Sequence, residues 1–153
     1  MSTPQDLQDP LALDRQVSYS LVVAARSVTA LYRPILDPLG LTHPQYLVLL
    51  ALWARGPRSV KDLSHELQLD SATLSPLLKR LEAMGHVWRV RRATDERVLE
   101  IGLTDQGREL REKAVAIPQQ IRDRLSMTEE QLEGLKTVLS QVIDNAKALP
   151  ETI

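Results

Sequence analysis

Positively charged side chains are concentrated in one stretch of this 153-residue chain. Between residues 79 and 97 there are six Lys or Arg and three Asp or Glu, a balance of +3. The whole chain carries −1, so the other residues together carry −4. A local cluster of this kind is suited to neutralise phosphate groups, and it indicates a surface that binds nucleic acid. The alternative is that these cations are only the solvated side of an ordinary helical hairpin and ribbon.

The residues around the start of this stretch have the types needed to read bases. The pattern predicts a helix that begins after Asp70 as its N-cap and ends at Gly85 as its C-cap, with leucines along one side. The other side carries short polar groups near the N-terminus and cations further on. Short side chains let a helix approach the major groove closely. The candidate DNA-binding residues on this helix are Ser71, Thr73, Ser75, Pro76, Lys79 and Arg80.

Two neighbouring elements complete the outline of a DNA reader. Val60, Leu63 and Leu67 recur at helical spacing, so a short helix is predicted over residues 59–67, and helix, tight turn, helix is typical of DNA-binding motifs. From residue 87 onward the pattern alternates, which predicts a β-hairpin with a charged turn over residues 93–97. The candidate DNA-binding residues of this hairpin are Arg89, Arg91, Asp95 and Arg97.

The rest of the chain offers little for catalysis or for metal binding. It contains no cysteine, which excludes disulfides, thiolate metal sites and a cysteine nucleophile. Its histidines, His43, His65 and His86, are too scattered for a metal-ligand spacing. Ser18 lies in an amphipathic helical pattern and not at a strand-to-helix elbow, which argues against a serine hydrolase. We therefore expect no enzyme, no metal site and no cofactor.

Length and composition place the protein among globular proteins with one domain. Hydrophobic residues make up 43% of the chain and charged residues 25%. No apolar run is long enough for a membrane span, and the N-terminus lacks the pattern of a signal peptide. A cytoplasmic location is therefore expected. Residues 1–10 contain two prolines and no apolar periodicity, and they are predicted to form a mobile arm.

Apolar stripes on both sides of the reader, which spans residues 56–103, predict further helices. Residues 11–55 are expected to hold two helices, the second capped by Thr42 and buried. Residues 104–149 are expected to hold one helix kinked by Pro118 and a last helix. A reader alone needs fewer helices, so we expect the first helix and the last two to form a homodimer interface. The alternative is a bundle closed within one chain.

Several segments resemble a known family. Residues 59–107, with the hairpin around Asp95 and the exit Leu103-Thr-Asp-Gln-Gly107, resemble the winged helix-turn-helix of the MarR family of bacterial transcription regulators. Residues 39–47, 69–81 and 113–118 are similar to the organic hydroperoxide-sensing branch, the OhrR type. The resemblance covers residues from about 13 to 149, and the whole chain is expected to be one MarR-type domain.

This resemblance carries implications for fold and function. It implies a mainly α fold with a small β-hairpin, in which a winged helix-turn-helix is joined to a helical dimerisation region. It also implies a sequence-specific repressor of an organic hydroperoxide resistance gene. Such a repressor binds a pseudo-palindromic operator in double-stranded DNA as a homodimer, and organic hydroperoxide is the inducer in the family.

Ser18 occupies the position that resembles the place of the family's peroxidatic cysteine. A serine hydroxyl has no accessible ionised form and no comparable oxidation ladder, so this chain is expected to be insensitive to peroxide and to remain competent for DNA binding. Tyr32 matches one tyrosine that the family places around the cysteine. His43 stands in place of another, where it either donates a hydrogen bond or is only a partly buried residue at a helix start.

Two explanations of Ser18 are open. Either a deliberate Cys-to-Ser change has removed the sensor from a peroxide regulator, or the chain is a natural relative that uses a different inducer. We favour the first, because the other motifs of the branch are kept. The alternative function is a MarR-type regulator that responds to a small-molecule ligand and not to peroxide.

Overall fold

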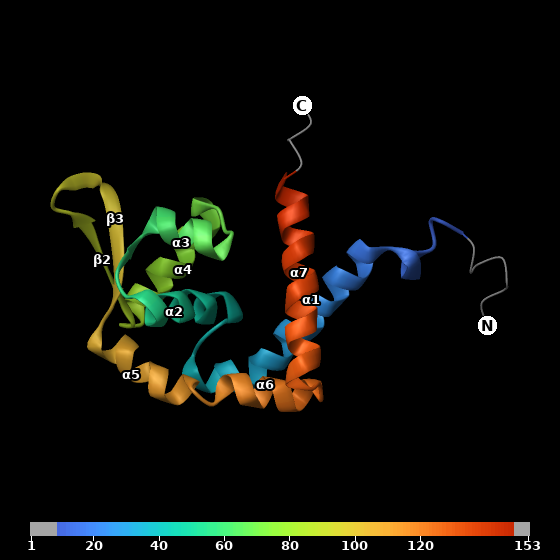
Figure 1. The fold of residues 1–153 in the computed structure, drawn as a ribbon. Helices are drawn as coiled ribbons and strands as arrows, with labels where there is room; N and C mark the ends of the chain where they lie inside the picture. Colours follow the sequence, from blue (N-terminus) through green and yellow to red (C-terminus); the bar gives the residue numbers. More distant parts are fainter. Residues whose placement is uncertain (1–8, 149–153) are drawn as a thin grey trace. The chain divides into compact units, whose positions relative to one another are not determined.

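The structure is a computed structural model that describes residues 9–148 (Figure 1). Residues 1–8 of the predicted mobile arm therefore lie outside the described residues. Leu149, the last residue of the predicted final helix, lies outside them as well. The chain divides into two compact units, Met1–Val115 and Ala116–Ile153. Between residues 9 and 148, no helix is long and apolar enough to cross a membrane.

The first unit opens with its longest helix, α1 (Val17–Leu36), which is followed by α2 (His43–Arg55). A short 3-10 helix, Leu13–Arg15, precedes α1, and a second one, Asp37–Leu39, leads towards α2. Thr42 caps α2 as predicted, because its side chain accepts from the Gln45 amide while the Gln45 side chain accepts from the Thr42 amide at 3.0 Å. Six of the 13 residues of α2 are buried, which confirms that this helix belongs to the core.

Side chains cap both helices of the reader, and the cap at Asp70 was predicted, whereas Ser59 was predicted to lie inside its helix. Helix α3 (Val60–Leu67) follows Ser59, whose hydroxyl accepts from the Asp62 amide at 3.0 Å. Helix α4 (Ser71–Ala83) follows Asp70, whose carboxylate accepts from the Thr73 amide at 2.7 Å. The predicted C-cap of α4 was wrong by one residue, since Met84 is the C-cap and Gly85 follows it with a left-handed φ of 84°.

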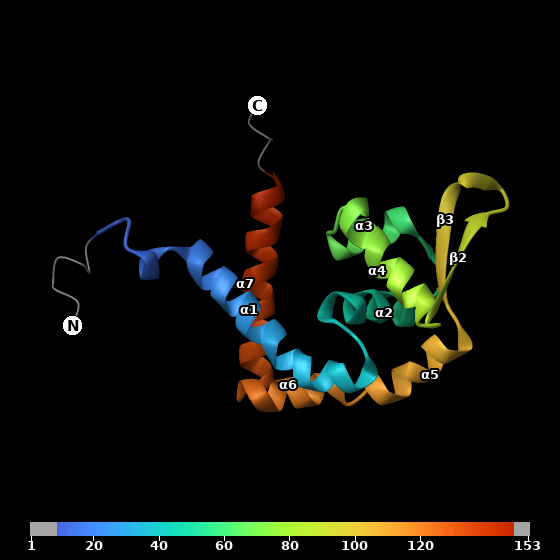
Figure 2. The same ribbon diagram turned by 180° about the vertical axis from the view of Figure 1, so that it is seen from behind.

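A small antiparallel sheet adjoins these helices, and its strand order is β1-β3-β2. The predicted hairpin consists of β2 (Val87–Arg92) and β3 (Asp95–Leu103), and it extends from the helices in both views (Figures 1 and 2). Strand β1 (Arg58–Ser59), which was not predicted, pairs with the other edge of β3.

The predicted turn over residues 93–97 was too long. Arg92 pairs with Asp95, so that only Ala93 and Thr94 lie between the strands. The register then shifts, because the next pair is Arg91 with Leu99 and residues 96–98 of β3 have no partner on β2. The polar residues after Thr94 therefore form a bulged start of β3 and not a continuation of the turn.

The core of the first unit is mainly aliphatic, since the chain contains no Phe and Tyr46 is the aromatic residue among its buried hydrophobic residues within the described part of the chain. Leucines of α2, α3 and α4 and Ile101 of β3 are almost completely buried. The members with at most 1% exposure include Leu49, Leu52, Leu63, Leu74, Leu78, Leu81 and Ile101. The leucine face of α4 is thus packed inside, which leaves its polar face outside.

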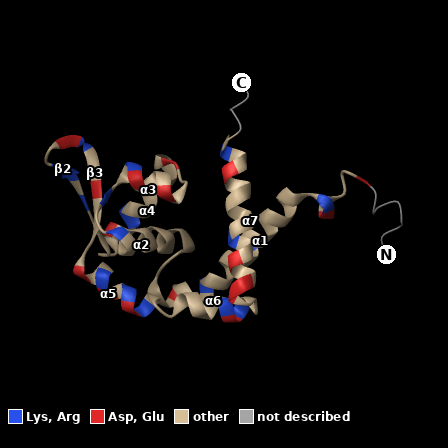
Figure 3. Ribbon diagram, viewed as in Figure 1, with Lys and Arg blue, Asp and Glu red and all other residues tan. Residues whose placement is uncertain are grey.

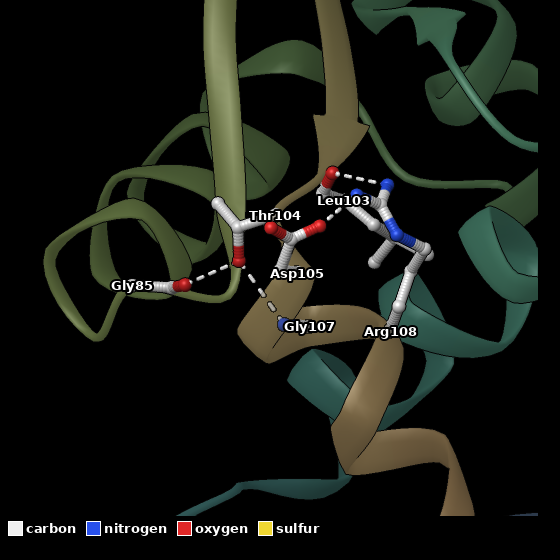
Figure 4. A network of polar contacts seen from close by, with 6 residues as sticks. All are labelled: Gly85, Leu103, Thr104, Asp105, Gly107 and Arg108. Carbon is white, nitrogen blue, oxygen red and sulfur yellow. Dashed lines mark hydrogen bonds and ion pairs between the residues drawn. The ribbon is translucent and has the colours of Figure 1, made fainter.

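Helix α5 (Asp105–Ala114) is attached to the reader by its N-cap, Thr104 (Figure 4). The Thr104 hydroxyl accepts from the Gly107 amide at 3.0 Å and donates to the Gly85 carbonyl. A Cβ at position 107 would lie 2.0 Å from the His86 carbonyl oxygen. Glycine is therefore required at this close approach and not merely tolerated there.

The second unit holds α6 (Ile117–Leu125) and α7 (Glu129–Ala148). The predicted single helix kinked at Pro118 was wrong, because α5 ends at Ala114 and α6 begins at Ile117. Pro118 has no backbone N–H, so it cannot make the hydrogen bond to the carbonyl four residues earlier that a continuous helix needs. In the first turn of a new helix the backbone N–H groups have no such partner, so proline costs no hydrogen bond there. Thr128 and Gln131 form the capping box of α7, with bonds of 2.9 and 3.1 Å.

Candidate nucleic-acid interface

Helix α4 presents the polar surface that its sequence predicts. Leu74, Leu78 and Leu81 are buried on one side of the helix. Of the six candidates on the helix, Ser75 is half-buried and the others are exposed, namely Ser71, Thr73, Pro76, Lys79 and Arg80. The cap at Asp70 fixes where the helix begins, and hydrogen bonds from the Thr73 amide and side chain hold the pKa of its carboxyl below the usual value. The exposed side thus begins with small polar groups and continues with two cations.

The tip of the hairpin places Asp95 beside Arg97. The Asp95 carboxylate accepts from the Arg97 backbone amide at 3.0 Å and from its Nε at 3.3 Å. The Arg97 side chain remains 92% exposed. A cation held at the hairpin tip by a neighbouring carboxylate, yet open to solvent, is well placed to contact a phosphate or to enter a groove.

The arginines along β2 differ in their availability, although Figure 3 shows them as one row of cations on the strand. Arg89 donates from Nε and Nη2 to the two carboxylate oxygens of Glu82, on α4, at 3.1 and 2.9 Å. These bonds lower the pKa of Glu82 and raise that of Arg89. Arg91 is exposed, and among residues 9–148 its side chain donates only to the Glu96 carbonyl, at 3.4 Å. Of the two, Arg91 is the cation free to meet DNA.

Ser18 and the proposed sensor-pocket residues do not come together within one chain. Ser18 is exposed in the first turn of α1, whereas Tyr32 lies 14 residues further along the same helix. At a rise of 1.5 Å per residue this separates them by about 21 Å. Tyr32 does meet His43, because their ring centroids are 4.6 Å apart.

Sequence reasoning missed two residues of these clusters. Tyr46 joins Tyr32 and His43, with its ring centroid 5.7 Å from that of Tyr32. Burial raises the pKa of both tyrosines and lowers that of His43, so burial favours the neutral form of each ring. Glu82 was missed because a single carboxylate on a helix gives no sign of the strand residue that it will meet.

Metal binding has no structural support in the part of the chain that the structure describes. Within residues 9–148, no three His, Cys, Asp or Glu side chains are grouped so that they could hold a metal ion.

Comparison with known proteins shows the family to which this chain belongs. The family model described as "Transcriptional regulator SarA/Rot" matches residues 30–114, more than half of the chain. The organic hydroperoxide resistance transcriptional regulator of Bacillus subtilis is 41% identical over 136 residues, 89% of this chain and 92% of that protein. The chain belongs to the MarR family, in the branch of the organic hydroperoxide regulators.

Other members of the family agree with this placement. The regulator TtmR of Methylorubrum extorquens is 44% identical over 92% of this chain and 72% of its own length. The structure of reduced AbfR bound to DNA is similar with a TM-score of 0.76 and 34% identity, over 92% of this chain and 96% of that one. AbfR, a protein of Staphylococcus epidermidis, has also been solved in a disulfide-formed state.

These findings confirm the predicted family, its branch and the winged-helix fold class. This MarR-type chain is a DNA-binding transcription regulator, as its relatives are, and it is not an enzyme.

Proposed function

We propose that this regulator is a homodimeric repressor that acts in the cytoplasm on an organic hydroperoxide resistance gene. The observation that carries the proposal is the pairing of two exposed surfaces in one unit. These are the polar face of α4, from Ser71 to Arg80, and the hairpin tip with Arg97. The likeness to the Bacillus subtilis regulator supports the choice of gene.

The two surfaces have different roles in this proposal. Helix α4 enters the major groove, where Ser71, Thr73 and Ser75 approach base edges. Pro76 adds only a short side chain to this face of the helix. Lys79 and Arg80, further along α4, contact phosphates. The hairpin grips the minor groove and the backbone through Arg91 and Arg97, with Asp95 orienting Arg97. Arg89 supports the hairpin through Glu82 and does not contact DNA directly.

Exposed apolar side chains on α1 and α7 support the homodimer. On α1, Val17 is 69% exposed and Val22 47% exposed. On α7, Leu135, Val138 and Ile143 are each between 46% and 56% exposed, and the helix has no buried residue. A second copy would remove this surface from water. Two readers related by a two-fold axis would then match inverted half-sites of a pseudo-palindromic operator about one helical turn apart.

The sensor position supports the same assembly. Ser18 lies about 21 Å from Tyr32 along α1, so a pocket that contains both groups has to combine Ser18 of one copy with Tyr32 and His43 of the other. With serine at this position the pocket holds no oxidisable thiol. The regulator therefore remains bound to its operator when organic hydroperoxide is present.

The alternative is regulation by a small-molecule ligand. AbfR has a disulfide-formed state, which requires cysteine, whereas this chain contains none. If Ser18 is the natural residue, another kind of inducer has to act. If it replaces a natural cysteine, the chain is a peroxide regulator locked in its DNA-binding form, and this is the explanation we favour.

Binding to fragmented genomic DNA at several salt concentrations tests the proposal. If two copies neutralise about 8 to 12 phosphates, log K falls with log[salt] at a slope of roughly −7 to −11. The bound fragments should share one inverted repeat. A slope near zero, or fragments without a common repeat, would refute a sequence-specific dimeric repressor.

A further inference from the structure

Helix α4 carries a proline in its interior. Backbone hydrogen bonding in the helix begins with the Leu74 amide, which donates to the Asp70 carbonyl at 3.0 Å. Pro76 lies beyond this first turn, where each amide of a helix normally donates to the carbonyl four residues earlier. Because proline has no N–H, the carbonyl of Ala72 lacks the donor that a helix interior supplies.

The helix continues in spite of this missing donor. Residues Ser71–Ala83 are all helical, and the buried side chains of Leu74 and Leu78 hold the helix against the core. Among residues 9–148, no side chain donates a hydrogen bond to the Ala72 carbonyl. Proline is the least favourable residue inside a helix, and the ring of Pro76 is exposed, so packing gives no reason for it. A residue that lowers stability on an exposed face is typical of a functional site.

Ala72 and Pro76 are neighbours on the exposed side of α4. Residues four apart lie next to each other on a helix surface, and both of these are exposed. The Ala72 methyl group is too small to cover its own carbonyl. A proline ring also crowds the carbonyl four residues earlier, which favours an outward tilt of that carbonyl. The polar face of α4 therefore presents a backbone acceptor beside an apolar ring.

We infer that the Ala72 carbonyl and the Pro76 ring together recognise one A·T base pair in each half-site. In the major groove adenine presents its N6 amine as a donor, and its thymine partner presents a C5-methyl group. The carbonyl accepts from the amine, while the ring packs against the methyl. A G·C pair offers an amine on cytosine but no methyl group, so it meets only half of this requirement. The inference rests on the proposed entry of α4 into the major groove.

This pair of groups selects more strongly than the side chains around it. The hydroxyls of Ser71, Thr73 and Ser75 can each donate or accept, so they tolerate more than one base. The Ala72 carbonyl can only accept, and the helix backbone fixes its direction. An acceptor of the opposing base, such as O6 of guanine, would repel it. The backbone at Ala72 thus supplies discrimination that the neighbouring hydroxyls lack.

Operator duplexes with single-group changes test the contact. Selection from random duplexes with the full-length parent first gives the half-site. Each A·T pair in it is then replaced in turn by purine·T, which lacks the N6 amine, or by A·uracil, which lacks the methyl group. At one pair in each half-site, both changes should weaken binding, each about three- to tenfold. If no A·T pair responds to both changes, the inference is wrong.

Variants at position 76 separate the two groups. Pro76→Ala and Pro76→Val both restore the N–H that pairs with the Ala72 carbonyl, whereas only valine keeps an apolar side chain of similar size. At the responding pair, the purine effect should disappear in both variants, and the uracil effect should persist in Pro76→Val alone. Lys79→Ala is the matched control, since it removes a cation from the same face. It should weaken binding to every duplex and leave both base effects intact.

Stability gives a second reading of the same carbonyl. Pro76→Ala should raise Tm, because it restores a helix hydrogen bond and replaces proline with the best helix former. A lower Tm would mean that the carbonyl already has a partner or that the ring is packed. A purine effect of unchanged size in Pro76→Ala would show that another group accepts from adenine. Either result would overturn the inference.

Failure of this inference is distinguishable from failure of the proposed function. A selected inverted repeat in which no A·T pair responds would refute the base contact alone. A selected site without an inverted repeat, but with a responding pair, would refute the homodimeric repressor and keep the contact. Selection of no common sequence would refute both.

Discussion

Arg89 on β2 is clamped to Glu82 on α4 by two hydrogen bonds, Nε to Oε2 at 3.1 Å and Nη2 to Oε1 at 2.9 Å. The Arg89 side chain is 23% exposed in this pair. The bidentate geometry ties the hairpin to the helix that carries the polar face. Arg89 therefore sets the position of the hairpin, and its charge is largely withheld from phosphate.

Freeing Arg89 should make DNA binding less selective. Glu82→Gln keeps the size of the side chain but removes the charge that holds the guanidinium. The freed cations should steepen the salt slope of DNA binding by about 1 to 2 for a dimer and raise affinity for random duplex more than for operator. Glu133→Gln, which opens an exposed pair with Lys136 on α7, is the matched control. An unchanged salt slope in Glu82→Gln would mean that Arg89 already contacts DNA.

The same pair gives a pH dependence with a defined sign. The pKa of Glu82 is lowered in the folded chain by hydrogen bonds from Arg89. The stability that the pair contributes is present above the ordinary pKa of a glutamate and is lost as pH falls through the lowered value. Unfolding curves of the parent and of Glu82→Gln should therefore converge at acid pH. Curves that stay equally separated down to the lowest pH would contradict this linkage.

Arg97 at the hairpin tip should contribute affinity without sequence preference. Replacing Arg97 with alanine removes one exposed cation from each copy, so it should weaken all duplexes alike and make the salt slope shallower by about 2 for a dimer. Lys147→Ala on α7 removes the same charge outside the reader and should have little effect. Altered base preference in the half-site read by α4 would instead reverse the roles given to the helix and the hairpin.

His86 should make stability depend on pH near neutrality. The residue is 6% exposed, its Nδ1 has no hydrogen-bond partner among the described residues, and burial lowers its pKa. His86 therefore binds a proton more readily in the unfolded chain than in the folded chain. The free energy of unfolding consequently falls as pH drops below about 6.5. His86→Asn should be closer to the parent in stability at pH 5 than at pH 8. A difference that does not change with pH would show that His86 does not titrate on unfolding.

Three glycines offer a graded test of the packing around the hairpin. Alanine at Gly107 would meet the His86 carbonyl at 2.0 Å, and alanine at Gly102 would meet the Trp88 ring at 2.1 Å. Each change should cost about 1–3 kcal/mol in thermal or urea unfolding, with Gly107→Ala the more severe because a backbone atom has to move. Gly134 lies inside α7 with no atom within 4 Å of an added Cβ, so Gly134→Ala should stabilise the chain by about 0.5–1 kcal/mol. Loss of stability in Gly134→Ala would show that this helix face is covered.

The helices of the reader were predictable because their signals are local. Asp70 and Ser59 are residue types that cap helix N-termini, and each side chain accepts from the backbone amide three residues later. The spacing of the leucines shows which side of each helix is buried. Strand β1 was not predictable, because two residues carry no periodicity and its pairing with Ile101 and Glu100 joins positions more than 40 residues apart. The break before α6 was misread as a kink because Pro118 permits either outcome, and the apolar row continues across it.

The candidate site shows the same division between local and distant information. Exposure of Ser71, Thr73 and Arg97 follows from helix periodicity and turn chemistry, which one segment contains. The pairing of Arg89 with Glu82 and the contact of Tyr46 with Tyr32 depend on packing between separate elements. No spacing in the sequence brings those residues together, so only the structure could identify them.

The most direct test of the account compares operator binding by the parent, Ser18→Cys and Ser20→Cys before and after addition of cumene hydroperoxide. Ser20 is an exposed serine on the same helix and controls for a thiol without the sensor position. The parent and Ser20→Cys should remain bound, whereas Ser18→Cys should release the operator and recover it with a thiol reductant. Release of the parent would place the sensor elsewhere, for example at Met84 or Met127. A Ser18→Cys protein that stays bound under peroxide would contradict the sensor position and leave a ligand-responsive regulator as the function.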